Sequence, residues 1–394
     1  MERRTVYGAD WERARTLLPF EIEDVARDSK ALVRRRQISS GEMLLRVLLT
    51  YASSGGTFEK TVSWLKDQGW ACMTPAALFF RLRGSALFLS RVLALMLRSD
   101  PGPSLSGFRL KIVDATSLSG PGSNGTDYRV HVMYNPKTGQ PYTVEVTSAL
   151  EGESFSRYSF EPGDLILADR GYSRARGIHH VLNQNANVLV RLHSNAIRVL
   201  EQDQTLINWS CREALVPEVG AYEFWARMPV PPPKARNNWR TRDAIAWHDV
   251  RFVGARNNIG EVVWLLTNLD TAQLGNEEAL SLYRQRWQIE LFFKRLKSLV
   301  DLDELPSRDP TTVVPWILLK LISALLAMNL TSEVFSPWGY LPRAVEQPLE
   351  KVQRRAHKTP SSPPRERSSH HRQPSRARQT KTKEATLPTL ALEA

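Results

Sequence analysis

The pattern of apolar and polar residues changes character along the first half of the chain. Between residues 10 and 98, apolar residues recur every three or four positions, as in GEMLLRVLLTYASSGG, which predicts amphipathic helices. After the linker DPGPSLSG, short runs rich in Val, Ile, Leu and Tyr alternate with turn sequences such as NPKTGQ. These runs predict three strands, a fourth strand, a helix over residues 173–183 and a fifth strand at NVLVRL. This order is typical of an α/β fold.

The second half of the chain contains a different mixture of elements. Residues 195–262 hold strand-like runs broken by the basic, proline-rich loop PVPPPKARNNWRTR, which predicts a mostly β insertion. The run EVVWLLTNLD predicts a buried strand, and NEEALSLYRQRWQIELFFKRLKSLV predicts one long helix. The most apolar segment, at 313–330, is interrupted by Pro315 and Lys320, so we expect a buried core helix and no membrane span.

The charge of the chain is unevenly distributed. The net charge is +12, and the segment from Lys351 to the end holds 11 Lys and Arg against 3 acidic residues. This tail is rich in Ser and Pro and has almost nothing to bury, so we expect it to be disordered. A basic chain favours an acidic partner such as nucleic acid. Two distant cysteines, Cys72 and Cys211, exclude a zinc ribbon and a disulfide framework, and the N-terminus shows no apolar signal segment. We therefore expect a cytoplasmic protein.

Four polar residues of different chemistry fall on one narrow stripe of the long predicted helix, when it is drawn at about 100° per residue. They are Tyr283, Arg286, Glu290 and Lys297. The stripe borders the apolar face that would pack on the core, and such a border is a favourable place for the residues of a site. Boundary charges that reach out to solvent would give the same pattern, so the helix alone leaves both interpretations open.

Two aspartates follow apolar strands. Asp114 in RLKIVDATSL and Asp169 in DLILADRGY share strand parity with the apolar residues before them. A carboxylate at the end of a buried strand is costly unless it is paired or binds a cation, although either aspartate alone could be a helix cap or a turn residue. Together with Glu290 they form three hard oxygen donors without His or Cys, a set that selects Mg²⁺ or Mn²⁺. Two such ions about 3.5–4 Å apart can hold the attacking and leaving oxygens of a phosphodiester exchange.

The spacing of the four stripe residues resembles a known signature. With two, three and six residues between them, they match the Tyr-Arg-Glu-Lys signature of bacterial insertion-sequence transposases of the DDE class, in the group often called insertion sequence four. The blocks VDATSL and LADRGY resemble those that carry the first and second aspartates of this family. The resemblance covers roughly residues 40–330, and it implies a ribonuclease-H-like catalytic core.

The resemblance also implies an architecture for the whole chain. We expect a helical N-terminal DNA-binding region at 1–100, a ribonuclease-H-like core at 108–194 and 261–300, a β insertion at 195–260, C-terminal helices at 301–345 and a disordered basic tail at 346–394. The signature helix belongs to the second part of the core.

The activity that the resemblance implies is cut-and-paste transposition of an insertion sequence, by end nicking, hairpin formation and strand transfer. Asp114, Asp169 and Glu290 would hold two Mg²⁺ ions, with Mn²⁺ as a substitute. The tyrosine, arginine and lysine of the signature would bind DNA phosphates. The implied partners are the terminal inverted repeats and the target DNA, bound by a homodimer on paired ends, in a nucleoid-associated bacterial protein.

Several neighbouring residues have two interpretations each. Trp264, in the strand before the signature helix, would stack on an extruded base or belong to the core. Trp287 is expected to pack. Arg170 and Tyr172, which follow the second aspartate, would flank the site or only form a turn. The tail would add non-specific DNA affinity or be dispensable.

Two other functions remain open at this point. One is a catalytically inactive, transposase-derived regulator that binds DNA ends. The other is a different ribonuclease-H-like metal nuclease, such as a junction resolvase, which would explain three carboxylates but not the matched spacing of Tyr283, Arg286 and Lys297.

Overall fold

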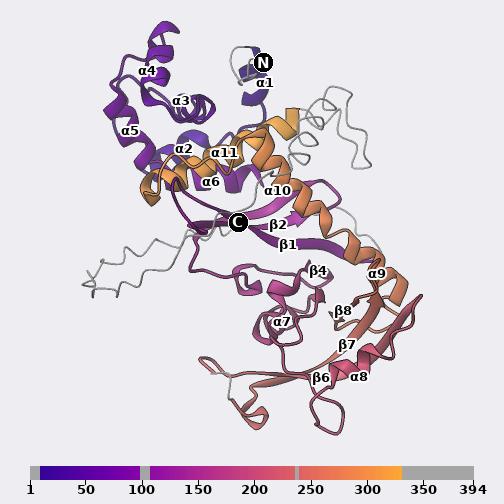
Figure 1. Ribbon diagram of the computed structural model, residues 1–394. Helices are drawn as coiled ribbons and strands as arrows, with labels where there is room; N and C mark the ends of the chain where they lie inside the picture. The colour runs from indigo at the N-terminus through magenta and orange to yellow at the C-terminus, as the bar shows by residue number, and fades with distance from the viewer. Residues whose placement is uncertain (1–8, 98–106, 236–238, 331–394) are drawn as a thin grey trace, which may run out of the picture. The chain divides into compact units, whose positions relative to one another are not determined.

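Six short helices begin the described part of the chain. The structure, a computed structural model, describes residues 9–97, 107–235 and 239–330 (Figure 1). The helices are α1 (Ala9–Arg15), α2 (Ile22–Asp28), α3 (Gly41–Ser53), α4 (Phe58–Asp67), α5 (Pro75–Arg83) and α6 (Ala86–Met96). The Ser40 hydroxyl caps α3 by accepting from the Met43 N–H, and the Thr74 hydroxyl caps α5 in the same way. The expected basic tail lies outside the described residues.

A long helix from the end of the described chain completes this helical layer. Helix α11 (Pro310–Leu330) packs against α3, α5 and α6. It is long and apolar enough to cross a membrane by length and composition, but 72% of its apolar window is buried inside the protein. Trp316, Ile317 and Leu321 are almost fully covered. Its apolar surface therefore serves as core, as the pattern with Pro315 and Lys320 predicted.

One mixed sheet of eight strands carries the rest of the described chain. Its order is β3-β2-β1-β4-β5-β8-β7-β6. Strands β1, β4 and β5 are parallel, and the other neighbours pair antiparallel. The strands are β1 (Arg109–Leu118), β2 (Tyr128–Asn135), β3 (Gln140–Ser148), β4 (Asp164–Ala168), β5 (Asn187–Arg191), β6 (Ala221–Val230), β7 (Ala246–Arg256) and β8 (Val262–Thr267). The insertion strands β6 and β7 thus extend the same sheet beyond β8.

Short helices lie between these strands and after the last of them. They are η1 (Phe155–Arg157), η2 (Arg170–Tyr172), α7 (Ala175–Leu182), α8 (Trp209–Glu213), η3 (Thr241–Asp243), α9 (Asn276–Arg284) and α10 (Trp287–Leu299). The prediction of a single helix over 276–300 was wrong, because the structure breaks it between α9 and α10. The bonds from Arg286 N to Tyr283 O and from Ile289 N to Arg286 O span three residues and tighten the chain there.

The two faces of the sheet are covered differently. Val113, Ile166 and Ala168 point into a buried cluster that Ile178 and Val181 of α7 join. Helix α10 packs against β1, and the Phe292 ring lies 5.3 Å from that of Tyr134. Because strand residues alternate in direction, the neighbours of Val113 and Ala168 face the α10 side. That alternation decides where the candidate aspartates point.

Candidate active site

The two candidate aspartates lie side by side on neighbouring strands. Val113 of β1 pairs with Ala168 of β4 in parallel register, and Asp114 and Asp169 are the next residues of the two segments. The pairing of β1 with β4 stops at this point, although β1 itself continues to Leu118 alongside β2. We expected Asp114 at the end of its strand. It lies instead within β1, at the point where the pairing with the parallel strand β4 stops.

Each aspartate is held by a backbone donor. The Asp114 carboxylate accepts from the Ala115 N–H at 2.8 Å, and Asp169 caps η2 by accepting from the Gly171 N–H at 2.8 Å. Burial raises the pKa of Asp114 to about 7, against the Ala115 hydrogen bond, and the charge of Asp169 adds to the rise. The fold thus holds two carboxylates close together although their negative charges repel each other.

Glu290 is connected to this pair through one guanidinium. Arg286 Nη1 lies 3.5 Å from Asp114 Oδ2, and Arg286 Nη2 donates to Glu290 Oε1. The Glu290 side chain is 57% exposed, whereas that of Asp114 is 13% exposed. Within residues 9–97, 107–235 and 239–330, no three His, Cys, Asp or Glu side chains lie close enough together to hold a metal ion. The guanidinium therefore lies between the carboxylates of Asp114 and Glu290.

The other two signature residues lie around the same place. Burial raises the pKa of Tyr283 to about 12, and Arg286 and Asp169 are among the charges that act on its hydroxyl. Lys297 Nζ lies 3.4 Å from the carbonyl oxygen of Ser117, three residues beyond Asp114 on β1. The four stripe residues therefore remain on one side of the broken helix and face the carboxyl ends of β1 and β4.

A fourth carboxylate, Glu153, stands beside Asp169, and the sequence interpretation missed it. It lies in the loop between β3 and η1, without periodic or motif signal. Burial and the charge of Asp169 raise its pKa. Arg191, at the end of β5, was also missed, and its charge acts on the Tyr283 hydroxyl. Arg191 is the polar last residue of the buried strand β5, which is the only signal that the sequence offered for it, and the sequence offered none for Glu153.

The flanking residues differ in exposure. Arg170 is exposed, and Tyr172 is buried at 1% exposure with its ring 5.1 Å from that of Phe155. Trp264 is 6% exposed and packs against the aromatic rings of Trp209 and Phe224. Trp287, which was expected to pack, is instead 53% exposed. The structure therefore places Trp264 in the core and Trp287 at the surface, one turn before Glu290.

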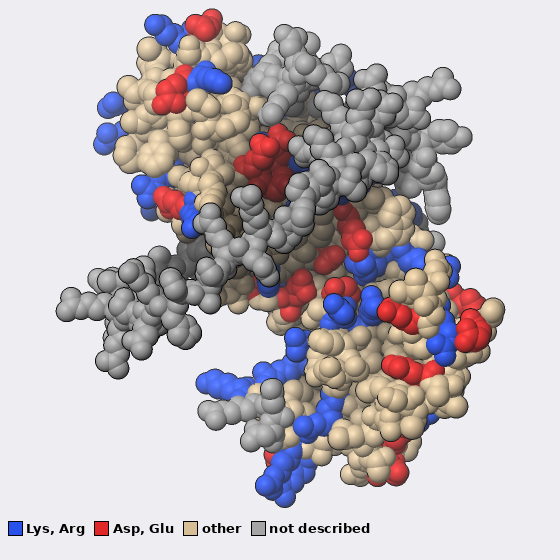
Figure 2. Space-filling model, in the orientation of Figure 1, with Lys and Arg blue, Asp and Glu red and all other residues tan. Residues whose placement is uncertain are grey.

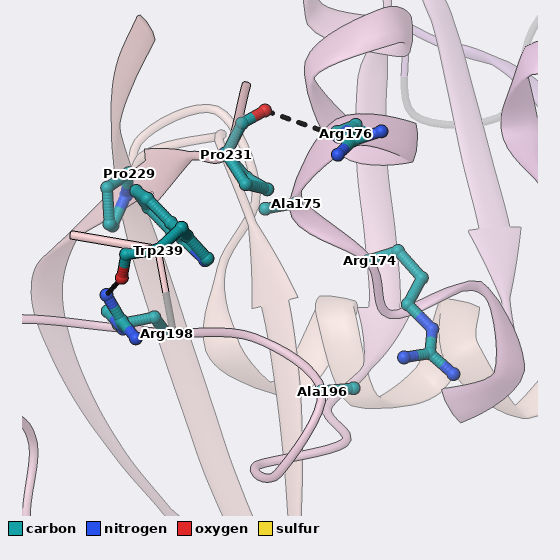
Figure 3. A pocket seen from close by; sticks show the side chains of 8 residues that line it. All are labelled: Arg174, Ala175, Arg176, Ala196, Arg198, Pro229, Pro231 and Trp239. Carbon is teal, nitrogen blue, oxygen red and sulfur yellow. Dashed lines mark hydrogen bonds between the residues drawn. The ribbon is translucent and has the colours of Figure 1, made fainter. Parts of the chain in front are cut away.

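Basic side chains gather beyond the site. Figure 2 shows Lys and Arg concentrated at the lower left, over the end of β6 and the loop toward β7. A hollow of about 280 Å³ in this region lies between α7 and the insertion (Figure 3). Arg174, Arg176 and Arg198 line it, and Trp239 stacks on the Arg198 guanidinium at 4.6 Å. Arg174 of this arginine hollow is exposed and follows Asp169 by five residues in the chain.

The donors suit an oxygen-seeking divalent cation. The acidic side chains around the site are Asp114, Asp169, Glu290 and Glu153. They offer carboxylate oxygens, and this chemistry matches Mg²⁺ or Mn²⁺. Gly171 has no side chain, and this lets the Glu153 carboxylate approach Asp169. A Cβ at Gly171 would collide with the Glu153 carboxylate. The residues present therefore fit the ion.

Comparison with known proteins agrees with the family resemblance of the signature residues. Residues 106–326 match the family model described as the transposase DDE domain. The chain is 30% identical over 339 residues to the transposase of insertion sequence element IS421 from Escherichia coli, which covers 78% of this chain and 90% of that protein. It is equally similar to InsL of insertion sequence element IS186A from E. coli K12, over 338 residues.

A more distant relative and a solved structure are also similar. The transposase of element IS231F from Bacillus thuringiensis subsp. israelensis is 23% identical over 358 residues, covering 74% of this chain and 73% of that protein. A piggyBac transposase synaptic complex with hairpin DNA aligns with a TM-score of 0.46 and 10% identity, over 89% of this chain and 82% of that one. The family match spans all eight strands, α9, α10 and most of α11, with both aspartates and all four signature residues. This chain belongs to the DDE transposase family of insertion sequences and is an enzyme that acts on DNA.

Proposed function

We propose that this enzyme moves an insertion sequence by cut-and-paste transposition, through a ribonuclease-H-like core. The strand order β3-β2-β1-β4-β5, with β2 antiparallel and β4 and β5 parallel to β1, supports this core. The observation that carries the proposal is the adjacency of Asp114 and Asp169, with Arg286 joining Asp114 to Glu290. These three carboxylates come from separate parts of the sequence, and Arg286 connects the aspartate pair to Glu290.

In this proposal the three carboxylates hold the divalent ions. When bound there, Mg²⁺ or Mn²⁺ would supply positive charge to the phosphate and lower the pKa of a water. Asp114 is fixed by β1 and by its Ala115 hydrogen bond, and Asp169 is fixed by its cap on η2. Glu290 is exposed and comes from a helix, so it is the carboxylate with freedom to adjust.

Arg286 has two roles in succession. In the free enzyme it neutralises the carboxylates of Asp114 and Glu290. With DNA present, its planar fork can turn to a phosphate beside the cut and leave both carboxylates available, since guanidinium binds phosphate by two parallel hydrogen bonds. Tyr283 and Lys297 provide a hydroxyl donor and a point charge on either side.

The proposed chemical sequence is the one that the family resemblance implies. Hydrolysis of one phosphodiester at the transposon end leaves a 3′-hydroxyl. This hydroxyl attacks the phosphodiester of the opposite strand, which forms the hairpin bond and releases the flanking DNA with its own 3′-hydroxyl. A second water opens the hairpin, and the same hydroxyl then attacks target DNA. Trp287 is the better candidate to stack on an extruded base, because it is 53% exposed whereas Trp264 is 6% exposed.

The arginine hollow is proposed to hold the DNA backbone away from the cut. It combines three guanidinium groups with Trp239, and Arg174 directly follows the segment that carries Asp169. Contacts of this kind bind phosphates without reading sequence. We further propose that two copies act on paired ends in the bacterial nucleoid.

End cleavage tests the proposal. The full-length enzyme is incubated with Mg²⁺ and a duplex that joins the inverted repeat flanking its coding region to adjoining DNA. Asp114→Asn, Asp169→Asn and Glu290→Gln should each bind this duplex but fail to nick it. Undiminished nicking by any of the three would contradict its role. Binding by the wild type without any nicking would favour the inactive regulator.

A further inference from the structure

We propose that Glu153 is a fourth carboxylate of the metal site, which positions a divalent ion against Asp169. The inference rests on the proposed function, because it concerns the same ions. It begins with Gly171, whose backbone has no positive φ angle and therefore places no conformational demand for glycine. Glycine is required at this position because a larger side chain would collide with a neighbouring group.

The Glu153 carboxylate lies directly over the α-carbon of Gly171. A Cβ built on Gly171 would lie 1.9 Å from Glu153 Oε2 and 3.0 Å from Asp169 Oδ1. The two carboxylate oxygens are therefore no more than about 5 Å apart, and two oxygens on one Mg²⁺ are at most roughly 4 Å apart. A single ion could bridge them after a small movement, and glycine is the residue that leaves the path open.

Glu153 has no hydrogen-bonding or ion-pairing partner in the described part of the chain. No hydrogen bond or ion pair joins its oxygens to the described residues, although the side chain is half-buried. Arg129 is the cation whose charge acts on it, but the Arg129 guanidinium donates to the Glu151 carbonyl oxygen. A half-buried carboxylate beside a second carboxylate is unfavourable unless a cation arrives.

The neighbouring glutamate shows the contrast. Glu151 belongs to the same loop, but its carboxylate pairs with Arg157 at 2.9 Å. Glu151 is thus satisfied by the protein itself, whereas Glu153 points toward the aspartates and is not. A purely structural acid would be expected to behave as Glu151 does.

Binding of Mn²⁺ to the full-length enzyme tests the inference. The ion alone is titrated, and free Mn²⁺ is followed by its paramagnetic resonance signal, for the wild type, Glu153→Gln, Glu151→Gln and Asp169→Asn. We expect Glu153→Gln to weaken binding by about tenfold or more and Glu151→Gln to leave it unchanged. Thermal unfolding in a chelator should show that Glu153→Gln is at least as stable as the wild type, since it removes a repulsion.

The outcomes separate the two proposals. If Asp169→Asn loses Mn²⁺ binding while Glu153→Gln binds like the wild type, the inference about Glu153 is overturned and the carboxylate site stands. If the wild type itself binds no Mn²⁺, both are overturned. A Glu153→Gln enzyme that is destabilised in chelator, with unchanged Mn²⁺ affinity, would assign Glu153 a structural role instead.

Discussion

Val113 and Ala168 pair across the parallel strands β1 and β4, and the residue after each of them is an aspartate. This register decides the chemistry of the edge, because it brings together two carboxylates separated by 54 intervening residues of chain. Replacing Asp114 or Asp169 by Asn should lower DNA end cleavage by about 10²–10³-fold or more. The melting temperature in chelator should not fall, since each variant relieves a like-charge contact, and a gel assay with calorimetry checks both.

Arg286 should matter for catalysis more than for stability. Its contact with Glu290 is at an exposed side chain, but its 3.5 Å contact with Asp114 is mostly buried, so Arg286→Gln should lower the free energy of unfolding by about 1–2 kcal/mol. Cleavage should fall by about 10²-fold, because the forked phosphate contact is lost. Arg284→Gln, at an exposed neighbouring position, serves as the control and should retain normal rates. Equal rates for both variants would remove the special role of Arg286.

The two tryptophans should separate stability from hairpin chemistry. Trp264→Ala should lower the free energy of unfolding by about 3–5 kcal/mol, because its buried ring packs against Trp209 and Phe224. Trp287→Ala should leave unfolding almost unchanged but slow hairpin formation relative to first-strand nicking. Denaturant unfolding and a strand-resolved cleavage assay measure the two effects. A Trp287→Ala enzyme with normal hairpin formation would refute the stacking role.

The arginine hollow should appear in the salt dependence of DNA binding. Each phosphate contact contributes about 0.9 to the slope of log affinity against log salt concentration. Arg174→Gln and Arg198→Gln should each reduce that slope by about one contact. Arg256→Gln, at the opposite end of β7 and paired with Glu218, is the matched control. Unchanged slopes for both hollow variants would mean that DNA does not pass there.

His131 should make the fold sensitive to acid. It is fully buried on β2, its Nε2 lies 2.9 Å from the Thr147 hydroxyl, and burial lowers its pKa to about 3. The unfolded chain takes up a proton near pH 6.5, whereas the folded chain does not. Stability is therefore fully present above pH 6.5 and falls by up to roughly 1.4 kcal/mol per pH unit below it.

The variant His131→Gln should lose that part of the pH dependence, because Gln can still donate to the Thr147 hydroxyl but does not titrate. Guanidinium unfolding at pH 7.5 and pH 5.5 compares the two proteins. Identical losses of stability in both would show that other groups cause the acid sensitivity.

The sequence allowed much of this edge of the sheet to be predicted. The alternation in RLKIVDATSL and DLILADRGY correctly placed Asp114 and Asp169 on the face opposite Val113 and Ala168, because period-two patterns are local. The spacing from Tyr283 to Lys297 identified the helix that faces them. Local pattern and motif spacing were therefore sufficient where each residue follows a regular element.

Other features depend on contacts that no local pattern records. The break between α9 and α10 contains neither Gly nor Pro, so periodicity through Gln285 and Arg286 predicted a continuous helix. Glu153 lies in a loop, and its approach to Gly171 exists only after the chain has folded. The extension of the sheet by β6 and β7 likewise depends on pairing with β8, which strand propensity does not specify.

The packing of α11 against α3 and α6 affects how the protein is made. More than 200 residues separate α6 from α11, so the ribosome releases α3 and α6 long before α11 has been synthesised. Leu93 of α6, which lines one small cavity together with Leu321, Ala324 and Leu325 of α11, would then lack that apolar cover. A nascent chain stopped before residue 310 should therefore bind chaperones or aggregate. The N-terminal helices reach their final packing only after the segments that carry the catalytic residues have been synthesised.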